Sequence, residues 1–208
     1  MKINYIKGMI NIAQFYYKYG TMDSSKTANL LMAVHSYETK GDRVLIFKPK
    51  TDTRSNPNMI ESRIELSHPC IDIDKDFNII DYITDNKLIE KIEAIFIDEC
   101  QWLTLTQILN LCFIVDKLDI PVLAYGLKNS YVKNELLEGA KYLLYYADKI
   151  EEIKNICVYC GKKATMNLRI ENKKPIYNGD TTHVGDTKEA KDYYIPVCRK
   201  HYFNPIIK

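Results

Sequence analysis

Three consecutive segments near the start of the chain constrain its fold more than any other feature. Ile12–Tyr19 is rich in β-branched and aromatic residues, which predicts a strand. A polar loop led by a glycine follows, and Lys26–Tyr37 then places apolar residues at helical spacing on one broad face. Strand, short loop and helix in this order begin a strand–helix–strand unit, so the chain is expected to build a parallel sheet.

The same alternation continues along the chain. Strands are expected at Val44–Phe47, Ala94–Ile97 and Pro121–Tyr125, and helices at Lys87–Glu93 and Thr104–Leu118. The run Ala94–Ile97 is wholly apolar, which is typical of a parallel strand buried on both faces. The predicted fold class is therefore α/β, with helices on both faces of a parallel sheet.

Two segments depart from this alternation. Lys50–Ile80 contains two Xaa-Pro steps and many charges, and it is interpreted as a loop that holds one short strand. The composition shifts near Glu151, and beyond it two short cysteine clusters flank a long loop around Asn178–Lys191. We therefore expect two domains, residues 1–152 and residues 153–208.

Charge and hydropathy exclude several classes of protein. Lys and Arg number 29 against 27 Asp and Glu, which argues against a protein that coats nucleic acid or an anionic membrane. No apolar run is long enough to span a bilayer or to serve as a secretion signal. The six cysteines are then expected to be reduced thiols or metal ligands in a cytoplasmic protein.

The loop after the first strand matches the Walker A pattern, a phosphate-binding loop, at seven of eight positions. The eight residues are Gly20, Thr21, Met22, Asp23, Ser24, Ser25, Lys26 and Thr27, with Ser25 in place of the second glycine. Backbone N–H groups at a helix N-terminus bind phosphate, Lys26 would neutralise the β- and γ-phosphates, and Thr27 would hold Mg²⁺. The alternative is a polar turn in which Ser24 or Ser25 caps the helix.

Two residues of this loop are unusual for a triphosphate site. If position 25 requires a positive φ, serine there costs on the order of 1 kcal/mol. If the position requires only room, the Ser25 hydroxyl is able to donate to a phosphate. Asp23 adds a negative charge near the expected triphosphate, and it is expected to weaken binding unless it points outward.

Two adjacent carboxylates follow the apolar run Ala94–Ile97, at the edge of the sheet where ligands bind in such folds. Successive strand residues point to opposite sides, so Asp98 and Glu99 are expected to differ in role. Asp98 would hold Mg²⁺ through water, and Glu99 would accept the proton of a substrate hydroxyl. The alternative is that both carboxylates only cap the next helix.

Cys157-x-x-Cys160 and Cys198-x-x-His201 are two half-sites with the ligand spacing of a tetrahedral zinc. The 37 residues between them exceed what a compact ribbon needs, so a loop must project from the site. Four protein ligands leave no open position, and the predicted zinc is therefore structural rather than catalytic.

Together these residues resemble the type II thymidine kinase family, the tetrameric zinc-containing class, from Tyr16 to Tyr202. Besides the glycine-led loop and the Cys157 half-site, the similar motifs are Asp52-Thr53-Arg54, Asp98-Glu99-Cys100-Gln101-Trp102, Ala124-Tyr125-Gly126-Leu127, Ala164-Thr165 and Cys198-Arg199-Lys200-His201-Tyr202. The resemblance implies a P-loop (RecA-like) kinase domain, a small C-terminal zinc-binding domain with a lasso loop, and a homotetramer.

The resemblance implies transfer of the ATP γ-phosphoryl group, with Mg²⁺, to the 5′-hydroxyl of thymidine, and it makes Glu99 the general base. It assigns ATP contacts to Gly20–Thr27, Asp52–Arg54 and Asp98–Gln101. It assigns the nucleoside pocket to Met22, Trp102, Tyr131, Asn167 and Tyr194, and to the backbone of Thr181, Thr182, His183, Val184 and Gly185. Because Asn167 stands where the family commonly has threonine near the base's 5-substituent, deoxyuridine is a hypothetical second substrate.

Two other functions stay open at this point. A nucleic-acid-dependent P-loop ATPase with a zinc ribbon predicts hydrolysis that polynucleotide stimulates, with a steep salt dependence. A catalytically weakened homologue that senses nucleotides would explain Asp23 and Ser25, although Lys26 and the acidic pair are intact. The kinase instead predicts ADP formation that requires a nucleoside.

Overall fold

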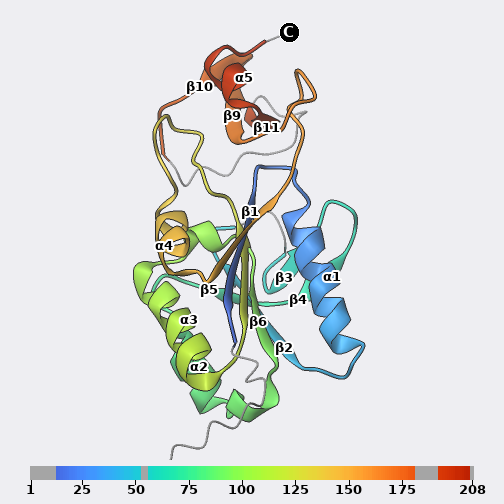
Figure 1. Cartoon of the computed structure of the whole chain (residues 1–208), viewed down its shortest axis with the longest axis vertical. Helices are drawn as coiled ribbons and strands as arrows, with labels where there is room; N and C mark the ends of the chain where they lie inside the picture. The colour runs from blue at the N-terminus through green and yellow to red at the C-terminus, as the bar shows by residue number, and fades with distance from the viewer. Residues whose placement is uncertain (1–12, 53–55, 181–191, 207–208) are drawn as a thin grey trace, which may run out of the picture.

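The computed structural model describes residues 13–52, 56–180 and 192–206. A six-stranded sheet with the order β5-β2-β6-β7-β1-β8 forms its centre (Figure 1). Every neighbouring pair of its strands is parallel, as the alternation of strands and helices predicts. The strands are β1 (Phe15–Gly20), β2 (Val44–Pro49), β5 (Ile71–Ile73), β6 (Ala94–Ile97), β7 (Val122–Gly126) and β8 (Lys149–Ile153).

Helices cover both faces of this sheet (Figure 1). One face carries α1 (Lys26–Glu38), and the other carries α2 (Ile79–Asp85), α3 (Leu105–Leu118) and α4 (Glu138–Tyr146). Strand β6 shows how the sequence achieves this. Ala94 and Phe96 pack with α1, Ile95 and Ile97 pack with the other three helices, and all four side chains are fully buried. The prediction of a strand covered on both faces is confirmed.

The predicted helix over Lys87–Glu93 is wrong. The α-helix in this region is α2, which ends at Asp85, and only a 3₁₀ turn at Ile89–Lys91 falls within the predicted range. Asn78 begins α2, because its side-chain oxygen accepts hydrogen bonds from two backbone N–H groups of the first turn. This asparagine is the start signal that the sequence interpretation overlooked.

The prediction of a loop with one short strand over Lys50–Ile80 is only partly right. The segment forms three strands, β3 (Met59–Glu61), β4 (Ser67–Pro69) and β5, and it also contains the start of α2. The first two strands make an antiparallel hairpin beside α1, and β5 joins the parallel sheet next to β2. Strands of three residues are too short to show an alternating pattern. Helix α4 and strand β8 also have no counterpart among the predicted elements.

A second, smaller sheet follows β8 in the chain. Its order is β10 (Lys174–Ile176), β9 (Met166–Glu171) and β11 (Asp192–Val197), and α5 (Arg199–Phe203) packs on it (Figure 1). It has its own buried cluster, which includes Leu168, Val197 and Tyr202. The division of the chain at residue 152 remains a prediction. Within the described ranges, the structure contains no helix with the length and apolarity needed to span a membrane.

Phe96→Ala is expected to lower the free energy of unfolding by about 3–5 kcal/mol, because it leaves a cavity between β6 and α1. The control is Met32→Ala on α1, where the side chain is 60% exposed and the expected loss is below about 1 kcal/mol. Urea unfolding followed by circular dichroism measures both values. Equal losses for the two variants would contradict the assignment of Phe96 to the core.

Candidate functional site

Two turns meet at the carboxyl edge of the large sheet. One is the glycine-led loop after β1, and the other is the acidic turn after β6, with β7 between the two strands. Thr27 at the start of α1 donates a hydrogen bond from its hydroxyl to Asp98 Oδ2 at 3.0 Å. The hydroxyl and the carboxylate expected to hold Mg²⁺ therefore lie in direct contact.

The glycine-led loop adopts a strained backbone. Asp23 and Ser25 have φ angles of 58° and 59°, in the left-handed region that favours glycine. Ser25 thus occupies a position that does require a positive φ, and the cost is on the order of 1 kcal/mol. Gly20 is needed for a different reason, since a Cβ there would lie only 2.9 Å from the Ile153 carbonyl oxygen.

Positive charge and an unused donor face the interior of this loop. Lys26 is buried, and its ammonium group folds back to donate to the Thr21 carbonyl at 2.7 Å. The Ser24 hydroxyl is also buried, and it has no hydrogen-bond partner in the part of the chain that the structure describes. A buried ammonium, an unsatisfied hydroxyl and a helix N-terminus together fit a phosphate group.

Asp23 does not leave its charge unbalanced. Its carboxylate forms an ion pair with Arg63, which lies between β3 and β4 in the hairpin beside α1. Asp23 therefore turns toward the hairpin, and the charge that was expected to weaken triphosphate binding is neutralised by a neighbour. In the predicted ATP-contacting stretch Asp52–Arg54, the structure describes Asp52, which is 8% exposed. Thr53 and Arg54 lie outside the described residues.

Glu99 is held by a short chain of hydrogen bonds. Its carboxylate accepts from the Gln101 amide, whose own oxygen accepts from the Leu127 backbone N–H at 2.9 Å. Glu99 is 5% exposed and has a φ of 49°, so backbone strain accompanies the placement of this carboxylate. Gln101, which the family resemblance assigns to ATP, is thus engaged by Glu99 and Leu127 through its side chain.

Two other side chains of the acidic turn, Cys100 and Trp102, pack into the protein interior. Burial raises the pKa of the Cys100 thiol well above its ordinary value, and the charges of Glu99 and Asp98 add to the effect. Cys100 therefore stays a neutral thiol at physiological pH. Trp102 is partly buried against the main hydrophobic cluster, at the end of the 3₁₀ turn that carries Gln101.

Two tyrosines of the predicted nucleoside pocket lie together. The rings of Tyr131 and Tyr194 meet edge to face, with centroids 5.7 Å apart at an angle of 67°. Burial raises the pKa of Tyr194 above its ordinary value, so it remains protonated. The other residues expected to bind the nucleoside edge, Thr181, Thr182, His183, Val184 and Gly185, lie outside the described residues.

Arg169 on β9 connects the chain on either side of segment 181–191. Its guanidinium binds both carboxylate oxygens of Asp192, at 2.8 and 2.9 Å, and donates to the Tyr131 hydroxyl at 3.1 Å. That hydroxyl in turn donates to the Asp180 carbonyl at 3.0 Å. Sequence reasoning missed Arg169, because a single arginine within a strand belongs to no spacing pattern.

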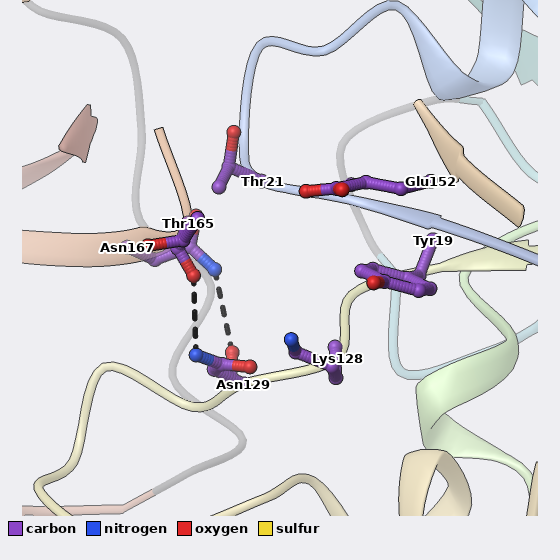
Figure 2. A pocket seen from close by; sticks show the side chains of 8 residues that line it. Tyr19, Thr21, Lys128, Asn129, Glu152, Thr165 and Asn167 are labelled. Atoms are coloured by element: carbon purple, nitrogen blue, oxygen red, sulfur yellow. Dashed lines mark hydrogen bonds between the residues drawn. The ribbon is translucent and has the colours of Figure 1, made fainter. Parts of the chain in front are cut away.

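Asn167, on β9, also binds other parts of the protein. Its side chain is 3% exposed, its oxygen accepts from the Met22 N–H at 2.7 Å, and its amide donates to the Asn129 carbonyl at 3.3 Å. Figure 2 shows Asn167 and Asn129 side by side at a small hollow that Thr21 and Lys128 also line. The hollow lies where the glycine-led loop meets the C-terminal sheet.

The four predicted metal ligands converge. The sulfur atoms of Cys157, Cys160 and Cys198 and a ring nitrogen of His201 all lie within 4.8 Å of one another. The two sulfur–nitrogen distances to His201 Nδ1 are 3.4 Å, and the Cys160–Cys198 sulfur distance is 3.8 Å. A tetrahedral zinc with Zn–S bonds of about 2.3 Å requires sulfur atoms about 3.8 Å apart. The cluster therefore fits a metal ion of this kind.

The protonation of Cys157 agrees with this function. Burial alone would raise the pKa of its thiol, but backbone N–H groups of Cys198, Tyr159 and Cys160, together with the His201 ring, lower the pKa to about 6. The thiolate is the form that ligates metal, and it predominates at neutral pH when the pKa is near 6.

Comparison with known proteins gives a consistent result. The family model described as "Thymidine kinase" matches residues 13–202 of this chain. A thymidine kinase of Streptococcus agalactiae serotype Ia is 49% identical over 196 residues, covering 94% of this chain and 100% of that protein. A thymidine kinase of Streptococcus pyogenes serotype M3 shows the same identity and coverage.

Cys157→Ala is expected to abolish stoichiometric zinc binding, because the three ligands that remain do not complete a tetrahedral site. Metal analysis of the purified full-length protein by mass spectrometry measures the effect. The control is Cys112→Ala, which removes a partly buried thiol of α3 outside the cluster and should leave the zinc content unchanged. A Cys157→Ala protein that retained about one zinc per chain would contradict the ligand assignment.

Proposed function

The chain belongs to the thymidine kinase family, and we propose that it transfers the γ-phosphoryl group of ATP to the 5′-hydroxyl of thymidine, giving dTMP and ADP. The hydrogen bond from Thr27 to Asp98 carries this proposal, because it joins the phosphate-binding turn to the acidic turn. Phosphoryl transfer needs little more from a protein than positioning and charge stabilisation around the phosphates. Family membership does not favour the alternative of a nucleic-acid-dependent ATPase.

ATP binds in this proposal through the glycine-led loop. The loop's N–H groups and the Ser24 hydroxyl donate to phosphate oxygens, and Lys26 balances the charge of the β- and γ-phosphates. Thr27 and Asp98 would hold the Mg²⁺ that accompanies ATP, and this ion would neutralise charge on the phosphates. Lys26 also stabilises the charge of the transferring group at the transition state.

Glu99 acts as the general base. Gln101 donates to one oxygen of the Glu99 carboxylate, and this bond restrains the orientation of the carboxylate. The proton of the 5′-hydroxyl passes to Glu99 as the oxygen attacks the γ-phosphorus, and the bond from that phosphorus to the β-phosphate oxygen breaks. ADP then leaves the glycine-led loop.

Tyr131 and Tyr194 line one side of the nucleoside pocket, and Trp102 and Met22 complete it as the family resemblance implies. Zinc at Cys157, Cys160, Cys198 and His201 is a structural ion in this proposal, because four protein ligands saturate it. The ion would hold the turn Cys157–Cys160, which precedes β9, against the start of α5.

A cytoplasmic homotetramer completes the proposal. Reduced thiols and a supply of ATP both belong to a reducing compartment. Leu109 and Phe113 lie one turn apart on α3 and remain 43% and 45% exposed, which is consistent with a helix face that another subunit covers. Light scattering on the purified protein measures the assembly.

Glu99→Gln is expected to lower kcat by roughly 10²–10⁴-fold, because glutamine keeps the shape of the carboxylate but accepts no proton at its amide. The dissociation constant for ATP should change little, since the phosphates bind on the other turn. Steady-state kinetics and calorimetry measure the two quantities, with Glu90→Gln on an exposed 3₁₀ turn as the control. A change in ATP affinity alone would show that Glu99 is not the base.

Deoxyuridine is expected to be phosphorylated with a kcat/KM at least equal to that of thymidine, because asparagine replaces threonine near the 5-position of the base. Competition assays with both nucleosides and saturating ATP measure the ratio. A strong preference for thymidine would end this hypothesis and would leave the proposed reaction intact.

A further inference from the structure

The strained loop between β1 and α1 needs external support. Asp23 and Ser25 both have positive φ, and neither is glycine. Residues in this conformation persist only where the surrounding structure holds them. Thr21 and Met22 directly precede them, so whatever fixes these two residues also determines the entry into the strained part of the loop.

Two asparagines from the C-terminal part of the chain hold Thr21 and Met22. Asn167 accepts a hydrogen bond from the Met22 N–H at 2.7 Å. Asn155 donates to the Met22 carbonyl at 2.9 Å and to the Thr21 hydroxyl at 3.2 Å. Both backbone polar groups of Met22 are therefore bound by side chains that lie more than one hundred residues away in the sequence.

Each asparagine is itself fixed. Asn167 is 3% exposed and donates to the Asn129 carbonyl, as Figure 2 shows. The Asn155 side-chain oxygen accepts from the Ile156 N–H at 2.8 Å, and its backbone carbonyl accepts from the Ala164 N–H at 2.8 Å. Groups fixed in this way impose a conformation on the loop rather than following it.

The ion pair between Arg63 and Asp23 is a weaker support. The Arg63 side chain is 63% exposed, and exposed ion pairs contribute little because water screens them. The asparagine contacts are partly buried, and an amide group left unsatisfied there is costly. The asparagines therefore support the loop more strongly than the Arg63 ion pair does.

We propose that Asn155 and Asn167 are positioning residues for ATP: they hold the phosphate-binding loop in its strained conformation and compensate for the glycine that is absent at position 25. This inference rests on the proposed function only in taking ATP as the ligand of the loop. Ser25 and the two asparagines then act as one unit, and their effects on ATP affinity are not additive.

Asn155→Ala tests the proposal, because Asn155 contacts the loop directly and reaches the nucleoside pocket only through the backbone of Met22. Loss of two hydrogen bonds to the loop is expected to raise the dissociation constant for ATP·Mg²⁺ by about five- to tenfold, measured by calorimetry without nucleoside. The KM for ATP should rise in parallel, and kcat at saturating ATP should change by less than about twofold.

A second substitution, Ser25→Gly, distinguishes support of the loop conformation from a general contribution of Asn155 to folding. In the Asn155→Ala background, Ser25→Gly is expected to recover at least half of the lost ATP affinity on a logarithmic scale, because glycine adopts positive φ without support. The matched control is Asn129→Ala. Its amide donates to the Thr165 carbonyl at the same junction and not to the loop, so ATP affinity should stay within about twofold.

Asn155→Asp keeps the shape of the side chain but removes the hydrogen-bond donor. This variant tests the role of Asn155 in ATP binding if Asn155→Ala does not fold. It should weaken ATP binding at least as much as Asn155→Ala. Unchanged ATP affinity in either variant, or no recovery by Ser25→Gly, would overturn the proposal. If these affinities follow the prediction and no nucleoside is phosphorylated, the positioning role stands and the proposed kinase reaction fails.

Discussion

The contact between Thr27 and Asp98 is the interaction on which the proposed site depends. It exists because β1 and β6 run parallel with β7 between them, which brings the turns after both strands to one edge of the sheet. Neither turn is complete by itself, since one contributes donors and positive charge and the other contributes carboxylates. The packing of the buried apolar strands thus brings together the charged and polar residues of the two turns.

Features that lie in consecutive residues were predictable from the sequence. The apolar run Ala94–Ile97 identified a strand buried on both faces, and the β-branched and aromatic residues before the glycine-led loop identified β1. The two x-x spacings of the cysteines and His201 identified a cluster that the structure brings together. In each case the physical signal is local, so the sequence carries it directly.

Features that depend on distant contacts were not predictable from the sequence. The helix expected over Lys87–Glu93 rested on local composition, whereas the cap at Asn78 begins the true helix earlier in the chain. Arg169 belongs to no motif, and neither does Asn155. The role of each emerges only when β9 and the segment before it meet the rest of the protein, as do the contacts of Asn167 with the loop. Such residues are identified by their partners and not by their spacing.

The proposed reaction is tested most directly by measuring ADP formation from ATP·Mg²⁺ with each common deoxynucleoside, with polynucleotide, and with neither. A thymidine kinase should form ADP only when a pyrimidine deoxynucleoside is present, with one nucleoside monophosphate produced for each ADP. ADP formation without a nucleoside, or stimulation by polynucleotide, would contradict it.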